Sequence, residues 1–239
     1  LLALFAMTLT AGETPFSGKF VGLIGNSVWV ASAAALVCAA AALWLAYAER
    51  LYPQRLVRGG VRVATLGYAV PGLVLAVALM LPMTSFDKWI ATALRDVLDI
   101  RWGLLLTGTS AALIFVYVAR FLTVAFNSTQ AGLIQIHPQL DAAARSLGHS
   151  PGRVLRRVHL PLLRPAILTG LLLVFIDVMK ELPATLILRP FNFETLATWV
   201  YRYASDERLA EASTAALAIV LVSLVPTVML SLSRHGETN

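Results

Sequence analysis

Long apolar runs separated by shorter polar connections are the dominant pattern of this sequence. Five runs reach bilayer length, because a helix needs about 20 apolar residues to cross the hydrocarbon core. They cover residues 27–47, 63–83, 103–126, 165–188 and 209–232. The apolar stretch at residues 1–12 is too short to span, and we expect a truncated helix at the start of a fragment of a longer polypeptide. The pattern predicts an all-α integral membrane protein with about six transmembrane helices, the first of them truncated.

Composition supports a membrane protein. Of the 239 residues, 58% are hydrophobic and only 13% are charged, whereas a soluble domain has about a quarter of its residues charged. The net charge of +6 is better explained by basic cytoplasmic loops than by nucleic-acid binding. The single cysteine, Cys38, lies in an alanine-rich apolar run, so neither a disulfide framework nor a thiolate metal site is predicted.

The distribution of charge predicts the orientation of the chain. The connection at residues 49–62 has four arginines and one acid, and the connection at 127–164 has five arginines and one acid. The connections at 87–101 and 189–208 each balance three basic against three acidic residues. Basic and balanced connections alternate, as consecutive crossings require, and positive charge is retained in the cytoplasm. We therefore expect the 127–164 loop and the C-terminus to be cytoplasmic.

The 127–164 loop contains a helix–glycine–helix pattern. Residues 138–147 favour a helix that Gly148 ends, and Ser150 and Pro151 are typical of the start of a second helix, which we expect Pro161 to end. Leu140, Ala143, Ala144 and Leu147 fall on one face of the first helix, and Arg145 lies beside that face. A short rigid unit of this kind suits the docking of a partner protein better than the binding of a small molecule.

The segment AAARSLGHSPGRVLRRVHLPLL resembles the EAA loop of bacterial ABC-importer permeases, whose pattern is Glu-Ala-Ala, three residues, Gly, nine residues, then Ile-x-Leu-Pro. The residues that match are Ala143, Ala144, Gly148, Leu160 and Pro161, with Val158 at the isoleucine position. Ala142 stands where the pattern has glutamate, and Asp141 precedes it by about 100° of helix rotation. The contact of that glutamate is therefore either absent here or made by Asp141.

The resemblance implies a type I ABC importer permease fold for residues 1–239, with residues 138–161 as the coupling loop that enters a groove of an ATP-binding subunit. The residues implied in coupling are Asp141, Ala143, Ala144, Arg145, Gly148, Leu160 and Pro161. No Gly-x-x-x-x-Gly-Lys-Ser/Thr phosphate loop occurs, so we expect no cofactor on this chain and ATP hydrolysis only in a partner subunit. The chain itself is not expected to be an enzyme.

Further segments, including DVMKELPATLILRPFNFETLATWVYRYASDERLAEAS, resemble the iron(III) permeases, and the chain resembles the C-terminal half of a fused two-half permease. The resemblance implies residence in the bacterial inner membrane and four partners: ABC ATP-binding subunits, a second permease half, a periplasmic substrate-binding protein and membrane lipid. Relatives carry thiamine, phosphonate, polyamines or sulfate, so these substrates are alternatives to ferric iron. A multi-span membrane scaffold or receptor without an ATPase is an alternative of another class.

Charged residues also occur inside the fourth apolar run. Asp177, Lys180 and Glu181 fall on one face if the helix continues through them, and Pro183 breaks it. Charges within a span are costly, so we expect them to meet a partner or a water-filled path. The alternatives are an ion cluster that locks helices together, a lining of the translocation path, and a gate near Pro183. No metal site is assigned.

The remaining polar residues give weaker signals. The four histidines, at positions 137, 149, 159 and 235, are expected to be solvated loop residues. In the balanced connection before the last run, a group of five residues is a candidate contact for an external partner, although interfacial anchoring would explain the tyrosines equally well. This group consists of Tyr201, Arg202, Tyr203, Asp206 and Glu207.

Overall fold

A computed structural model describes residues 4–5, 7–8, 17–98 and 106–235. Within these residues the ordered elements are all helical, and five helices are long and apolar enough to cross a membrane. These spans are Gly18–Leu51, Gly72–Asp96, Ser110–Gln135, Pro151–Met179 and Leu209–Val228. The five spans expected from the apolar runs are confirmed, with shifted boundaries. The truncated first helix expected at residues 1–12 lies largely outside the described residues.

Three helices form the core: α2 (Gly18–Leu51), α5 (Ser110–Gln135) and α8 (Leu160–Met179) pack against one another. The Ser17 side chain caps α2 by accepting a hydrogen bond from the Phe20 N–H. Small residues on α2, among them Ala34 and Ala35, have no exposed surface. Such residues allow helix backbones to approach closely, so the alanine run of α2 forms the surface on which α5 and α8 pack.

The second apolar run is divided into several elements. Helix α3 (Arg55–Ala64) and the 3₁₀ turn η1 (Gly67–Ala69) precede α4 (Gly72–Leu98). The spanning helix therefore starts at Gly72, and α4 continues without a break to Leu98. Asp87 on α4 accepts hydrogen bonds from the Leu106 and Thr107 N–H groups at 2.9 and 2.6 Å, which fixes the turn before α5.

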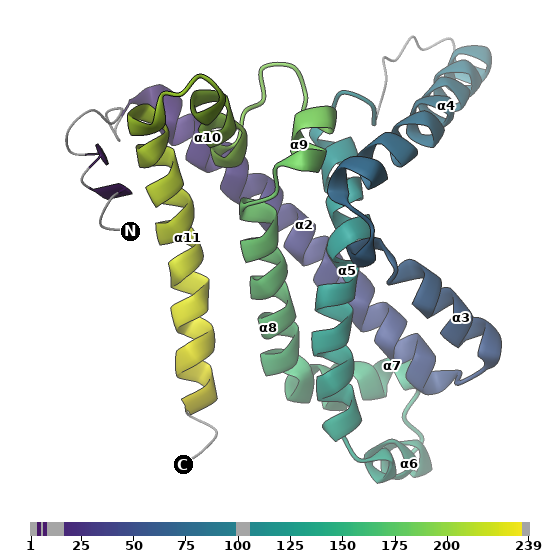
Figure 1. Ribbon diagram of the computed structural model, residues 1–239. Helices are drawn as coiled ribbons and strands as arrows, with labels where there is room; N and C mark the ends of the chain where they lie inside the picture. Colours follow the sequence, from purple (N-terminus) through teal and green to yellow (C-terminus); the bar gives the residue numbers. More distant parts are fainter. Residues whose placement is uncertain (1–3, 6, 9–16, 99–105, 236–239) are drawn as a thin grey trace.

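The fourth apolar run is also divided. Helix α8 ends at Met179, and the short helix α9 (Pro183–Leu188) follows. Helix α10 (Leu196–Ser205) begins with a capping box between Thr195 and Thr198 and packs on α11 (Leu209–His235). Figure 1 places α9 and α10 at one end of the bundle and the short helices α6 (Pro138–Ser146) and α7 (Pro151–Val154) at the other. The α6 end and the α10 end thus form two separate surfaces.

Close packing of η1 on α5 gives the first prediction. A Cβ atom at Gly67 would lie 1.8 Å from the carbonyl oxygen of Ala119, so the backbone must move to admit a side chain. We expect Gly67→Ala to lower the free energy of unfolding by about 1–3 kcal/mol. Gly60→Ala is the matched control, because Gly60 lies in α3 with open space around it and alanine favours a helix. Thermal unfolding of the purified protein in detergent checks the pair, and equal midpoints for both variants would contradict the packing argument.

Candidate functional site

Helix α6 and the turn after it form a rigid projection at one end of the bundle (Figure 1). The Gln139 N–H donates to the His137 ring at the start of α6, and Pro138 occupies its first turn. After its end, Gly148 adopts a left-handed φ of +76°, and the N–H groups of Gly148 and His149 donate to the carbonyl oxygens of Arg145 and Ala144. The predicted glycine stop is confirmed, and its physical basis is the left-handed conformation that glycine adopts without strain.

The outward side of α6 is apolar at its centre. Leu147 is 75% exposed and Leu140 is 45% exposed, with the exposed Ala143 between them. Ala144 instead points inward and is buried, so the face expected from the sequence is divided between an exposed side and a side that faces the bundle. Arg145 is exposed, and its Nε donates back to the Asp141 carbonyl. An exposed apolar strip with a basic border suits a protein partner.

Asp141 faces the bundle and holds α6 against two other helices. Its Oδ2 accepts from Arg50 Nε at 2.8 Å, and its Oδ1 pairs with His159 Nε2 at 2.5 Å. The side chain of Asp141 is 19% exposed, that of Arg50 16% and that of His159 0%. We call Arg50, Asp141 and His159 the Asp141 clamp. Three segments far apart in the chain meet at this carboxylate.

Arg50 extends the clamp to the end of α5. Its two terminal nitrogens donate to the carbonyl oxygens of Leu133 and Ile136 at 2.6 and 2.9 Å, two groups that lie at the helix terminus. Tyr47, one turn earlier on α2, donates its hydroxyl to the Pro151 carbonyl at 2.7 Å and lies 5.4 Å from the His159 ring. The start of α7 is therefore fastened to the same helix as α6.

The electrostatics of the clamp favour the charged form of Asp141. Burial alone would raise the pKa of this carboxyl, but the hydrogen bonds from Arg50 and His159 outweigh burial and hold the pKa below its ordinary value. The side chain is thus a carboxylate at neutral pH. Asp141 therefore points toward the bundle, while Ala142, at the position where the pattern has glutamate, is exposed.

The second half of the loop corrects two predictions. Pro161 does not end a helix, because α7 continues through a π-helical segment, η2 (Leu155–His159), into α8. The wider turn, in which the Leu160 N–H bonds to the Leu155 carbonyl, accommodates a proline that removes one donor. His159 is not a solvated loop residue but is fully buried. Leu160 and Pro161 remain exposed at the start of α8.

The charged residues of the fourth run are separated by the end of α8. Asp177 and Lys180 pair at 3.0 Å, and the Lys180 side chain is 63% exposed. Glu181 is not on their face, because the helix ends at Met179 before the next turn can form. It is buried, pairs with Arg120 of α5 at 3.4 Å and accepts from the Ala184 N–H at 3.2 Å. The prediction that all three charged residues share one helix face is therefore wrong. Pro183 does not break a continuous helix but follows the break, as the first residue of α9.

Arg120 is a site residue that the sequence reasoning missed. The sequence did offer a signal for it, because Arg120 is a basic residue within an otherwise apolar run that forms α5. Its guanidinium lies against Gly72, where a Cβ atom would meet Arg120 Nη1 at 1.6 Å and Glu181 Oε1 at 2.7 Å. The Arg120–Glu181 pair therefore occupies space that only glycine leaves at the start of α4. Among the described residues, no group of three His, Cys, Asp or Glu side chains could hold a metal ion.

The Asp141 clamp gives the second prediction. Asp141→Asn keeps the shape but removes the charge, so we expect faster amide hydrogen exchange over residues 138–149, by about tenfold to a hundredfold at neutral pH. Because the pKa of Asp141 is depressed, its stabilisation is complete above the ordinary value of 3.8 and is lost as the pH falls through the lower folded value. The asparagine variant should lack this acid dependence. The matched control is Asp206→Asn, an exposed acid after α10; equal exchange in both variants would refute the clamp.

Comparison with known proteins shows that this chain is similar to inner-membrane components of transport systems. A profile of the family described as "Binding-protein-dependent transport system inner membrane component" matches residues 39–235. The chain is 31% identical over 212 residues to the Fe(3+)-transport system permease protein FbpB 2 of Haemophilus influenzae, an alignment that covers 89% of this chain and 39% of that protein. It is 34% identical over 123 residues to PhnV of Salmonella typhimurium, a permease protein named for 2-aminoethylphosphonate transport, covering 52% of this chain and 44% of that protein.

A further relative is the ferric transport system permease protein FbpB of Actinobacillus pleuropneumoniae, which is 26% identical over 207 residues, covering 86% of this chain and 29% of that protein. The chain spans less than half the length of each of these three relatives.

Solved structures show the same fold. A chain of a bacterial alginate ABC transporter, crystallised with an alginate pentasaccharide-bound periplasmic protein, superimposes with a TM-score of 0.74 at 16% identity, covering 96% of this chain and 85% of that one. A chain of the MetNI methionine ABC transporter, in an inward-facing conformation, superimposes with a TM-score of 0.58 at 16% identity, covering 91% and 95%. At such identities the likeness concerns the fold alone, and the predicted all-helical ABC-importer permease fold is confirmed.

Proposed function

This chain belongs to the family of binding-protein-dependent transport system inner membrane components, and we propose that it is the permease part of an ABC importer that moves ferric iron across a bacterial inner membrane by alternating access. Membership of a transport family favours this function over a scaffold or receptor. The observation that carries the mechanism is the Asp141 clamp, which fixes α6 to α2 and to η2, the segment that continues into α8, while leaving Leu140, Ala143 and Leu147 exposed.

Energy for transport would come from a partner subunit that binds and hydrolyses ATP, since this chain has no phosphate-loop motif. In this proposal α6 sits in a groove of that subunit, and the exposed strip around Leu147 fills the groove. Movement of the partner would then pass through the clamp to α2 and α8. The rigid connection is what allows a small displacement at α6 to tilt two core helices.

In this proposal the α6 end lies at the inner side of the membrane. Arg145, Arg153, Arg156 and Arg157 are all exposed there, as expected for segments kept in the cytoplasm. The C-terminus would lie on the same side, because α11 runs from the α10 end toward the α6 end (Figure 1). A periplasmic substrate-binding protein would then meet the α10 end.

The substrate proposal is supported by relatives named for ferric transport, two of which match 86% or more of this chain. A second permease half would complete the path, and the exposed Lys180 beside Asp177 is a candidate lining group, since a charge in a span needs water or a partner rather than lipid. The Arg120–Glu181 pair at the α8–α9 break, in which Glu181 is buried and Arg120 is partly buried, is a candidate gate. Iron is cargo in this proposal, and the carboxylates guide it without a stable site, because a tight oxygen cage would hinder release.

The turn at Gly148 tests the coupling mechanism. A branched side chain is strained at its φ of +76° by about 1–3 kcal/mol, whereas asparagine tolerates this conformation. We expect Gly148→Val to reduce ATP-driven uptake of labelled iron by about tenfold or more, and Gly148→Asn to retain most of it. Uptake into membrane vesicles holding the complete transporter checks this, with immunoblotting to confirm equal insertion. Full uptake by the valine variant would exclude a role for this turn.

The substrate has its own test. Cells that express the complete transporter should accumulate labelled ferric iron, and an excess of 2-aminoethylphosphonate should leave that uptake unchanged. Phosphonate uptake without iron uptake would instead assign the chain to the substrate of the Salmonella relative. The Gly60→Ala transporter serves as the control for expression, because Gly60 has open space around it.

A further inference from the structure

A hollow of about 780 Å³ opens at the α10 end of the bundle. It lies between the start of α2, the 189–195 loop and α10. Among the residues that line it are three cations, Lys19, Arg189 and Arg202, and one acid, Glu194. The surface of the hollow therefore has an excess of positive charge, at the end opposite the arginine-rich α6 loop.

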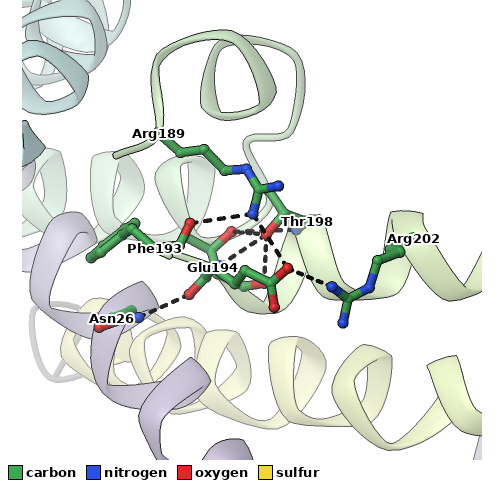
Figure 2. Close-up of polar contacts among 7 residues, drawn as sticks. Asn26, Arg189, Phe193, Glu194, Thr198 and Arg202 are labelled. Carbon is green, nitrogen blue, oxygen red and sulfur yellow. Dashed lines mark hydrogen bonds and ion pairs between the residues drawn. The ribbon is translucent and has the colours of Figure 1, made fainter. Parts of the chain in front are cut away.

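Glu194 neutralises part of this charge from inside the hollow (Figure 2). Its carboxylate lies 2.7 Å from Arg202 Nη1 and 3.4 Å from Arg189 Nη1. Its backbone carbonyl separately accepts a hydrogen bond from the Asn26 side chain at 3.0 Å, which ties the loop to α2. The loop thus has a backbone anchor that does not depend on the carboxylate, so the carboxylate can leave the arginines without detaching the loop.

Two of the three cations lie over one aromatic side chain. The Arg202 guanidinium lies 4.1 Å from the ring centroid of Trp199, and Lys19 Nζ lies 4.3 Å from the same centroid. Trp199 is 1% exposed, whereas the Arg202 side chain is 47% exposed. A buried ring orders two long side chains while leaving their charges accessible, which lowers the entropy that a binding partner must overcome.

The rim of the hollow presents an apolar contact. Phe191 is 94% exposed, and the following Asn192 has a φ of +59°. Arg189 donates to the Phe193 carbonyl at 3.3 Å, which closes the loop into a tight turn. A fixed loop that displays an aromatic side chain beside ordered arginines has the composition of a protein-interface centre.

We propose that the hollow receives a carboxylate side chain of the soluble substrate-binding protein, which replaces Glu194 on Arg202 and Arg189 while Phe191 packs against the same partner. The occupant is a protein with an acidic surface, because the hollow offers paired arginines, an aromatic rim and space beyond a single ion. Glu194 acts as an internal competitor that keeps the arginines neutralised in the free transporter. This inference rests on the proposed function, in which the α10 end faces the periplasm.

The test uses charge-neutralising variants that should change affinity in opposite directions. Arg202→Gln removes the ligand of the incoming carboxylate and should weaken binding on the order of threefold to tenfold. Glu194→Gln removes the competitor and should strengthen binding on the order of threefold, with a steeper salt dependence. Arg208→Gln is the matched control, since Arg208 pairs with Glu211 and does not line the hollow.

The measurement is a titration of the substrate-loaded binding protein of the same transport system against the complete transporter in nanodiscs of zwitterionic lipid. Opposite shifts for Arg202→Gln and Glu194→Gln, with no shift for Arg208→Gln, would support the exchange. If both variants weaken binding or neither changes it, Glu194 and Arg202 form only a structural pair and the inference fails. If the wild-type transporter binds no binding protein at all, the proposed function itself fails.

Discussion

The carboxylate of Asp141 is the interaction on which the arrangement of the α6 end depends. A partly buried charge is stable only when its hydrogen-bonding capacity is satisfied, and Asp141 achieves this with Arg50 from α2 and His159 from η2. Arg50 in turn satisfies two carbonyl groups at the end of α5. A single acidic side chain therefore ties the short helix α6 to α2 and η2, at the end of the bundle where Arg50 also bonds the end of α5. Without it, α6 would be held chiefly by the chain on either side.

A second charge pair imposes a comparable constraint near the opposite end of the core. Arg120 and Glu181 lie 3.4 Å apart and pair within an apolar bundle, where an isolated charge is costly. Their position requires Gly72 at the start of α4 and a break in α8 before Pro183. The glycine at the start of α4, the break after α8 and the ion pair therefore depend on one another. Through these contacts the pair connects α4 and α5 to the junction between α8 and α9.

The two ends of the molecule hold their charges differently, and this difference suits their proposed roles. At the α6 end, His159 is fully buried and Asp141 is largely covered, so in the proposed mechanism the clamp would transmit displacement as a rigid link. At the α10 end, Arg202 and Glu194 are partly exposed, as the proposed exchange with another carboxylate would require. Rigid coupling to a motor and exchangeable contact with a soluble partner are the physical requirements of a binding-protein-dependent importer.

The five spans, the alternation of basic and balanced loops, and the helix–Gly148–helix pattern were predictable from the residues, because hydrophobicity and glycine conformation act locally along the chain. The residues alone did not reveal which way Asp141 faces, that His159 is buried, that the chain continues as a helix through Pro161, or that Glu181 leaves the face of Lys180. Those outcomes depend on partners distant in sequence: Arg50 lies 91 residues from Asp141, and Arg120 lies 61 residues from Glu181. Only the tertiary structure decides such pairings, since a buried charge takes the partner that packing brings within hydrogen-bonding distance.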